Sequence, residues 1–254
     1  MICAISQPTY LPWLGMMNLI DQVDVFVFYN DVQVVKQSWG TRNQIKTNQG
    51  SLWLAVPIVH NNHFNEMFFY NTFVDEKMNW KKKHFKSIQN AYSKAGHYKE
   101  VISWLEPVLI TEETNLGNIN MYIIEEIAKA IGITTKFLKS SDLQSKEGVK
   151  DDRLVDICKE LNANIYLSPL GSHVYIEEKN ESGAYIHSSI QLLYQHYEHP
   201  QYKQLHGDFI NYMSVIDLLL NEGFENALHI IRSGNKQPFT SLDIRKKYLN
   251  EAGF

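Results

Sequence analysis

The chain has 254 residues, 44% of them hydrophobic, which is enough to bury a full core as one large domain or two modest ones. Its net charge of −4 and its sequence pI near 6.2 argue against a general binder of nucleic acids or membrane surfaces. The two cysteines, Cys3 and Cys158, both lie in apolar patterns and give no disulfide framework, so we expect a reducing cytoplasm. No apolar run approaches the length of a membrane span, and we therefore expect no membrane insertion.

The first thirty or so residues predict a βαβ unit. A short apolar run at residues 2–5 is typical of a buried strand, and a helix is expected to open at Gly15. Residues 24–29, a run of β-branched and aromatic side chains, predict the second strand. The stretch from Gln7 to Gly15 then lies at the carboxyl end of the first strand, where open α/β sheets bind their ligands. We expect the active site there.

The composition of this loop favours a ligand-binding role. Pro8 and Pro12 each fix one φ angle, so the loop costs little entropy to order. Tyr10 and Trp13 are large amphipathic rings, and Gln7 offers amide donors and a carbonyl. The alternative is structural: the two rings cover the core and the prolines shape a connection.

The rest of the chain alternates between strand and helix patterns. Strands are predicted at residues 52–58, 133–138, 164–168 and 190–197. Helices are predicted at residues 79–92, 98–105, 116–131, 151–161, 212–221 and 224–231. This alternation predicts an α/β fold, with a parallel, doubly wound, Rossmann-like or HUP-like sheet flanked by helices and a helical C-terminal portion.

Two units are expected along the chain. Residues 1–232 form one α/β domain in this interpretation. Residues 233–254 start with Gly, Asn, Lys and Pro among their first residues, and they predict a loosely attached tail with one short helix.

Polar residues after the second strand are candidates for ligand contact. Asn30 and Asp31 follow that strand directly, where an acidic residue often binds a ribose hydroxyl, although an Asx turn explains them equally well. Arg42 and Lys46 stand four residues apart beside Asn43. Such a pair of cations could hold a phosphate or carboxylate, or could be solvated loop charges.

A second candidate wall of the pocket follows the strand predicted at residues 190–197. His199 is a candidate general acid or base because histidine titrates near neutral pH. Tyr202 and Gln204 follow it in a stiff polar and aromatic segment, and Ser168 ends the strand at residues 164–168. The segment from Ser214 to Asp217 has the form of a capping box, which accounts structurally for both residues.

Several common site types are disfavoured by the sequence. His196, His199 and His206 fit no common zinc spacing, so we predict no metal site of the protein itself, with Mg²⁺ entering only with a nucleotide. The patterns GxxxxGK[ST], GxGxxG, GxSxG and CxxC are all absent. A P-loop kinase, a plain Rossmann dehydrogenase and an α/β-hydrolase are therefore disfavoured.

Five sequence blocks resemble the WbqC-like protein family, in the family's order from residue 2 to about residue 232. They are QPxYxPWxG from Gln7, WxxRNxIK from Trp39, YLS from Tyr166, YxHPxYxQ from Tyr197 and SVIDLLxNxG from Ser214. The resemblance implies a bacterial protein, often encoded among genes for O-antigen or other surface polysaccharides. It also implies a role in decorating amino sugars, with an amino-acyl group as one candidate.

A second similarity concerns the first loop alone. The order of strand, Pro-aromatic loop and Trp13-Leu14-Gly15-Met16 is similar to the His-x-Gly-His loop of nucleotidylyltransferases and pantothenate-synthetase-like ligases, which hold ATP phosphates at this turn. Both histidine positions carry other residues here, Trp13 and Met16. The architecture is therefore expected to be shared while the phosphate chemistry differs.

The preferred function is a transferase or amide-forming ligase that acylates a nucleotide-linked amino sugar. In this hypothesis Tyr10 and Trp13 stack on base or sugar, and Gln7 and Asn30 hydrogen-bond to it. Arg42 and Lys46 hold phosphate or carboxylate, and His199 accepts the amine proton. The sequence leaves open whether ATP is used and whether the chain is a homodimer. The alternatives are a non-catalytic binder of sugar nucleotides or glycan intermediates, and an interaction protein of an assembly complex.

Overall fold

The computed structural model describes residues 1–59, 66–145 and 147–249. Its main sheet has five parallel strands in the spatial order β5-β2-β1-β6-β7. The strands are β1 Ile2–Ser6, β2 Val25–Phe28, β5 Lys136–Lys139, β6 Ile165–Ser168 and β7 Gln191–Tyr194. The prediction of a parallel, doubly wound α/β fold is confirmed.

Helices cover both faces of this sheet, which is why its central strands are apolar on both sides. One face carries α1 Leu14–Asp21, α4 Leu116–Ile131 and α7 Val215–Ser233; the other carries α5 Asp151–Glu160, α6 His173–Ile176 and α8 Ser241–Ile244. Side chains alternate between the two cores along each strand. In β1, Ala4 belongs to the core under α1, whereas Cys3 and Ile5 belong to the core under α5. None of the described helices is long and apolar enough to cross a membrane.

The helix predicted at residues 116–131 is confirmed with both of its ends. The Asn115 side chain accepts a hydrogen bond from the backbone N–H of Asn118, which caps the amino end. Gly132 has φ of 86° and ends the helix in the left-handed conformation that glycine adopts without strain.

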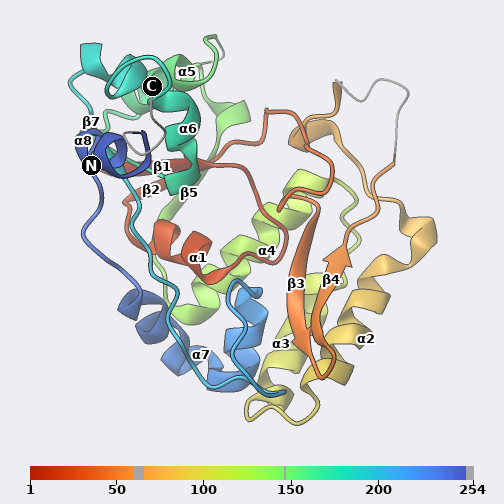
Figure 1. Ribbon diagram of the computed structural model, residues 1–254. Coiled ribbons are helices and arrows are strands. Elements are labelled where there is room, and N and C mark those ends of the chain that lie inside the picture. Colours follow the sequence, from red (N-terminus) through yellow and green to blue (C-terminus); the bar gives the residue numbers. More distant parts are fainter. Residues whose placement is uncertain (60–65, 146, 250–254) are drawn as a thin grey trace.

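The strand predicted at residues 52–58 exists, but its assignment to the parallel sheet is wrong. β3 Arg42–Thr47 and β4 Gly50–Ala55 form a separate antiparallel hairpin beside α2 Trp80–Tyr92 (Figure 1). The turn between Thr47 and Gly50 is far too short for a parallel crossover, which needs about a dozen residues. Arg42 and Lys46 therefore lie on a strand rather than in a loop.

The remaining helices and turns complete the connections. The helix predicted at residues 98–105 is longer, α3 Tyr98–Leu109. Short 3₁₀ helices lie at Phe69–Asn71, Glu76–Met78, Ser140–Asp142, Leu170–Ser172 and Gly183–His187, and a π-helical turn at Arg245–Leu249. The two helices predicted at residues 212–221 and 224–231 form α7, interrupted at Gly223, where φ is 77° and ψ is 173°.

The capping-box interpretation at the start of α7 is half wrong. Ser214 caps the helix, since its Oγ accepts a hydrogen bond from the N–H of Ile216 at 3.2 Å. The Asp217 carboxylate instead accepts hydrogen bonds from the hydroxyls of Tyr92 and Tyr202, each at 2.7 Å. The helix start is packed into the protein, so Asp217 is fully buried and finds tyrosine donors there.

The expectation of a loosely attached tail is also wrong for the described part of it. Phe239 and Tyr194 exchange two backbone hydrogen bonds of 2.8 and 2.9 Å, so the tail adds to the free edge of β7. Ile244 is fully buried, and Arg245 donates to the carbonyl of Glu177 at 2.9 Å. An edge strand offers unpaired backbone groups, which gives the tail its partner. Residues 250–254 lie outside the described residues.

Candidate functional site

The strand order of the sheet reverses between β1 and β6. The chain runs from β1 through β2 to β5 on one side, and then from β6 to β7 on the other. Open α/β sheets bind ligands in the crevice outside the carboxyl ends of the strands at such a point. A cavity of about 460 Å³ lies there, and its lining residues with polar groups are Ser6, Gln7, Tyr29, Lys150, Tyr166, Ser172 and Tyr175. We call it the switch-point cavity; its size is that of a small-molecule site.

Gln7 and Ser168 stand at the ends of the two strands that frame this cavity. The structure places Gln7 in its wall, directly after β1. Ser168 is fully buried behind that wall, and its hydroxyl is hydrogen-bonded to the hydroxyl of Ser172, which lines the cavity. Gln7 can therefore meet a ligand directly, whereas Ser168 supports a neighbour.

Asp31 is held by a nearly buried ion pair beside the cavity. Its carboxylate contacts the guanidinium of Arg153 on α5, and the two side chains are 12% and 10% exposed. The Arg153 guanidinium also lies 5.1 Å from the centroid of the Tyr29 ring, which lines the cavity. The pKa of Tyr29 is raised by burial, while Arg153 acts to lower it. Asp31 thus orients the wall through Arg153 and Tyr29.

Asn30 connects the ends of β2 and β5. Its side-chain oxygen accepts from the backbone N–H of Ser141 at 3.0 Å, and its amide nitrogen donates to the Ser141 hydroxyl at 3.0 Å. Asn30 is 3% exposed. The arrangement gives it a structural role at the ends of these two strands.

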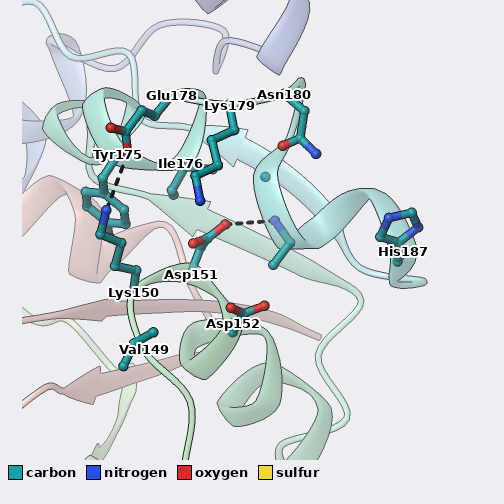
Figure 2. Close-up of a pocket in the computed structure, with 12 residues that line it drawn as sticks. Val149, Lys150, Asp151, Asp152, Tyr175, Ile176, Glu178, Lys179, Asn180 and His187 are labelled. Carbon is teal, nitrogen blue, oxygen red and sulfur yellow. Dashed lines mark hydrogen bonds and ion pairs between the residues drawn. The ribbon is translucent and has the colours of Figure 1, made fainter.

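Lys150 and Tyr175 form the wall that the sequence interpretation missed. They also line a second cavity, of about 390 Å³, and Figure 2 shows them next to each other on that side. Lys150 precedes α5 with φ of 53° and ψ of −127°, a conformation that side-chain-bearing residues rarely adopt and that is often found at functional sites. Burial raises the pKa of Tyr175 to about 12, so its hydroxyl is a hydrogen-bond donor at neutral pH.

Tyr10 and Asn43 hold the first loop from inside. The Tyr10 hydroxyl lies 2.9 Å from Nδ1 of His84, and its fully buried ring packs edge-on against Trp80. The Asn43 amide donates to the carbonyl of Leu11 at 2.7 Å. Both side chains have protein partners for their polar groups, and neither is exposed to the cavity.

Lys46, Tyr202 and Gln204 surround the buried carboxylate of Asp217. Asp217 accepts from the Tyr202 hydroxyl at 2.7 Å and from the Gln204 amide at 2.9 Å, and burial raises its pKa. The Lys46 ammonium donates to the carbonyl of Asp208 at 2.5 Å, and Lys46 is 1% exposed. These contacts tie the loop after β7 to the hairpin and to α7.

His199 belongs to an aromatic cluster with Trp13. Its ring is stacked on Trp13, with centroids 6.3 Å apart and 20° between the planes. Nδ1 lies 2.9 Å from the carbonyl of Pro200, while the buried Nε2 has no hydrogen-bond partner. Burial lowers the pKa of His199, so the ring is neutral at pH 7. With Nδ1–H donating to Pro200, Nε2 keeps the lone pair that a general base needs.

The structure thus divides the predicted site residues between the two faces of the sheet. Trp13 packs against the core under α1, whereas Ile5 and Tyr166 of the switch-point cavity belong to the core under α5. Gln7 lines the cavity, Ser168 contacts its lining residue Ser172, and Asn30 and Asp31 follow its lining residue Tyr29 in the sequence. The side chains of Trp13, Lys46, His199, Tyr202 and Gln204 do not line it. Among the described residues, no group of three or more His, Cys, Asp or Glu side chains could hold a metal ion.

The entry into α1 depends on the absence of a side chain at Gly15. A Cβ built there would lie 2.1 Å from Cη2 of Trp13. We expect Gly15→Ala to lower the free energy of unfolding by about 1–3 kcal/mol, because the indole must move out of a packed position. Urea denaturation measures this. Gly171→Ala is the control, since nothing lies within 4 Å of a Cβ there; equal midpoints for the two variants would contradict the packing described.

Comparison with known proteins places this architecture in a family. The model of the WbqC-like protein family matches residues 7–229. The chain is 35% identical over 224 residues to the uncharacterized protein Rv1507c of Mycobacterium tuberculosis, and the match covers 87% of this chain and 94% of that protein. No solved structure matches significantly. The matched region includes the first loop, the hairpin, both walls of the switch-point cavity and most of α7. The chain therefore belongs to the WbqC-like protein family.

Proposed function

We propose that the chain is an enzyme of bacterial surface-polysaccharide (O-antigen) biosynthesis that joins an acyl or aminoacyl group to an amino sugar or nucleotide-linked amino sugar. Membership of the WbqC-like family, which suggests a polysaccharide-related function, supports the pathway class. The observation that carries the site is the switch-point cavity, which opens where α/β sheets bind nucleotides. The two unlinked cysteines suit the reducing cytoplasm proposed as its location.

The cavity offers groups suited to a nucleotide or a nucleotide sugar. Lys150 supplies a cation for phosphate, and its partner Glu178, 3.3 Å away, forms only a solvent-exposed ion pair that an anionic ligand can replace. Gln7 supplies amide hydrogen bonds and the Tyr175 hydroxyl supplies a donor. The Ser172 hydroxyl, which donates to the Pro169 carbonyl at 2.7 Å, can still accept a hydrogen bond. These four side chains are the proposed ligand contacts.

In the proposed reaction the sugar amine attacks an activated acyl carbonyl, an amide bond forms, and the leaving group departs from the carbonyl carbon. The amine proton passes to a base. His199 has the protonation state required, but it lies with Trp13 on the α1 face. That separation favours a second candidate function, a sugar-nucleotide binding protein without catalysis, in which the cavity alone is used.

Mass spectrometry of the sugar nucleotide tests the proposal. The protein is incubated with UDP- or dTDP-linked amino sugars and either amino acids with ATP and Mg²⁺ or acyl-CoA esters. The expected result is a mass increase equal to the acyl group, and this product is lost in Lys150→Ala. Lys159→Ala, an exposed lysine at the other end of α5, is the control and should react normally. If the sugar nucleotide binds but is recovered unchanged, the proposal of an enzyme is overturned and the binding protein is favoured.

A further inference from the structure

Two exposed tryptophans and a partly buried arginine lie together on the hairpin and the segment just before it, and none of the three lines the switch-point cavity. Trp39 and Trp53 are 45% and 42% exposed, and their ring centroids lie 5.8 Å apart with 38° between the planes. The Arg42 guanidinium carbon lies 4.2 Å from the centroid of the Trp53 ring. We call Trp39, Arg42 and Trp53 the Trp–Arg platform. Neighbouring exposed tryptophans are more typical of recognition surfaces than of an ordinary surface.

The platform is backed by ordered structure. The carbonyl of Trp39 accepts a hydrogen bond from the backbone N–H of Tyr10 at 2.8 Å. Behind Trp39, Gly40 packs so closely on Phe69 that a Cβ would lie 2.6 Å from its ring. Arg42 is paired with Ala55 in the hairpin. The rings are therefore positioned in advance, which reduces the entropy cost of binding a ligand.

Arg42 retains its hydrogen-bonding capacity. Its guanidinium makes no hydrogen bond or ion pair with any residue that the structure describes, and its buried Nε has no partner. A guanidinium presents five N–H donors in a planar fork, and that fork matches a carboxylate in two parallel hydrogen bonds. An arginine stacked on a ring but without an acidic partner is suited to an anionic ligand.

The sequence around Arg42 carries positive charges and no negative ones. Residues 32–65 contain three Lys or Arg and no Asp or Glu, within a chain of net charge −4. Within the hairpin Lys46 is buried, so Arg42 is its accessible cation on a protein of net negative charge, and the absence of nearby acidic residues in the sequence favours encounter with anions.

We propose that the Trp–Arg platform binds an anionic sugar, a pyranose ring that carries a carboxylate, as in a uronic acid. The apolar C–H face of the ring stacks on the indoles, and the carboxylate is held by the Arg42 fork. The choice of a sugar rests on the proposed function; the ring and the negative charge rest on the platform itself. A single-stranded nucleic acid fits less well, because it requires a basic groove along its backbone and this platform offers one guanidinium.

Two glycosides that differ only at the carboxylate test the proposal. Calorimetric titrations with methyl β-D-glucuronide and methyl β-D-glucoside are expected to show at least tenfold tighter binding of the glucuronide. Arg42→Ala should abolish this preference, and Trp39→Ala should weaken both sugars at least fivefold. Arg232→Ala is the matched control, an exposed arginine on α7 paired with Asp21, and should bind like the unmodified protein.

Further variants keep the test decisive. Arg42→Lys preserves the positive charge and the hairpin, and it should retain part of the preference because only the fork is lost. The proposal is overturned if the two glycosides bind equally well, if the glucuronide does not bind, or if Arg42→Ala keeps the preference for it. It is also overturned if an oligothymidylate binds more tightly than the glucuronide through Arg42. Lys150→Ala should leave glucuronide binding unchanged. The glucuronide titration therefore tests the platform independently of the proposed nucleotide site.

Discussion

Asp31→Ala is expected to lower the free energy of unfolding by about 3–5 kcal/mol, because it leaves the nearly buried guanidinium of Arg153 without its charge partner. The loss should be large because the Arg153 Nε is already buried without a hydrogen-bond partner. Urea denaturation at pH 7 measures it. Asp156→Ala, which breaks an exposed ion pair with Lys159 on the same helix, should cost about 1 kcal/mol or less.

A double variant distinguishes the effect of losing the ion pair from the effect of losing side-chain volume. Asp31→Leu combined with Arg153→Met removes both charges while filling much of the same volume. It should be more stable than Asp31→Ala alone, because no uncompensated buried charge remains. A loss below about 1 kcal/mol in Asp31→Ala would contradict the burial of this pair.

Acidification from pH 7 to pH 4 is expected to remove about 3 kcal/mol of stability through His84 alone, at about 1.4 kcal/mol per pKa unit. Burial lowers the pKa of His84 from 6.5 to about 4, against a smaller opposing effect of a backbone hydrogen bond to Ala55. Between pH 6.5 and about 4, His84 becomes protonated in the unfolded chain but stays largely neutral in the folded protein. The contribution is therefore complete above pH 6.5 and is lost as the pH falls toward about 4.

The measurement is the unfolding free energy of the unmodified protein and of His84→Gln between pH 7 and pH 4. Glutamine can still hydrogen-bond to the Tyr10 hydroxyl, which His84 Nδ1 contacts at 2.9 Å. Asp217 acts in the opposite direction, because its raised pKa makes the folded state take up a proton before the unfolded state does. The difference between the two proteins isolates His84. A pH slope that is equal in both would contradict its buried, neutral state.

The sheet and its covering helices could be predicted from the sequence because their signals are local. The apolar run of β1 and the Asn115 and Gly132 ends of α4 are each visible within one segment. The hairpin was misassigned because residues 52–58 have strand composition, and composition does not identify the neighbouring strand. The role of Asp217 was missed for a similar reason: its partners Tyr92 and Tyr202 come from other segments of the chain.

The sequence predicts a site at the loop after β1, and a candidate cavity lies beside that loop, although few of the predicted residues line it. The loop after β1 does reach the switch-point cavity, and Gln7 lines it. Tyr10 was expected to stack on a ligand, but its ring is fully buried, because nothing in an amphipathic residue type shows which way it faces. Lys150 lies in the turn before α5 and Tyr175 lies on α6, so their meeting at the cavity depends on tertiary structure. The positive φ of Lys150 could not be predicted, because lysine does not favour that conformation.

The measurement that tests the central claim most directly is calorimetric titration with UDP- and dTDP-linked amino sugars. The claim is that the switch-point cavity binds the nucleotide-linked sugar. We expect Lys150→Ala to weaken binding at least tenfold, by about 1.4 kcal/mol or more, and Lys159→Ala to bind like the unmodified protein. Binding by the unmodified protein that Lys150→Ala and Gln7→Ala leave unchanged, or no binding at all, would contradict the account.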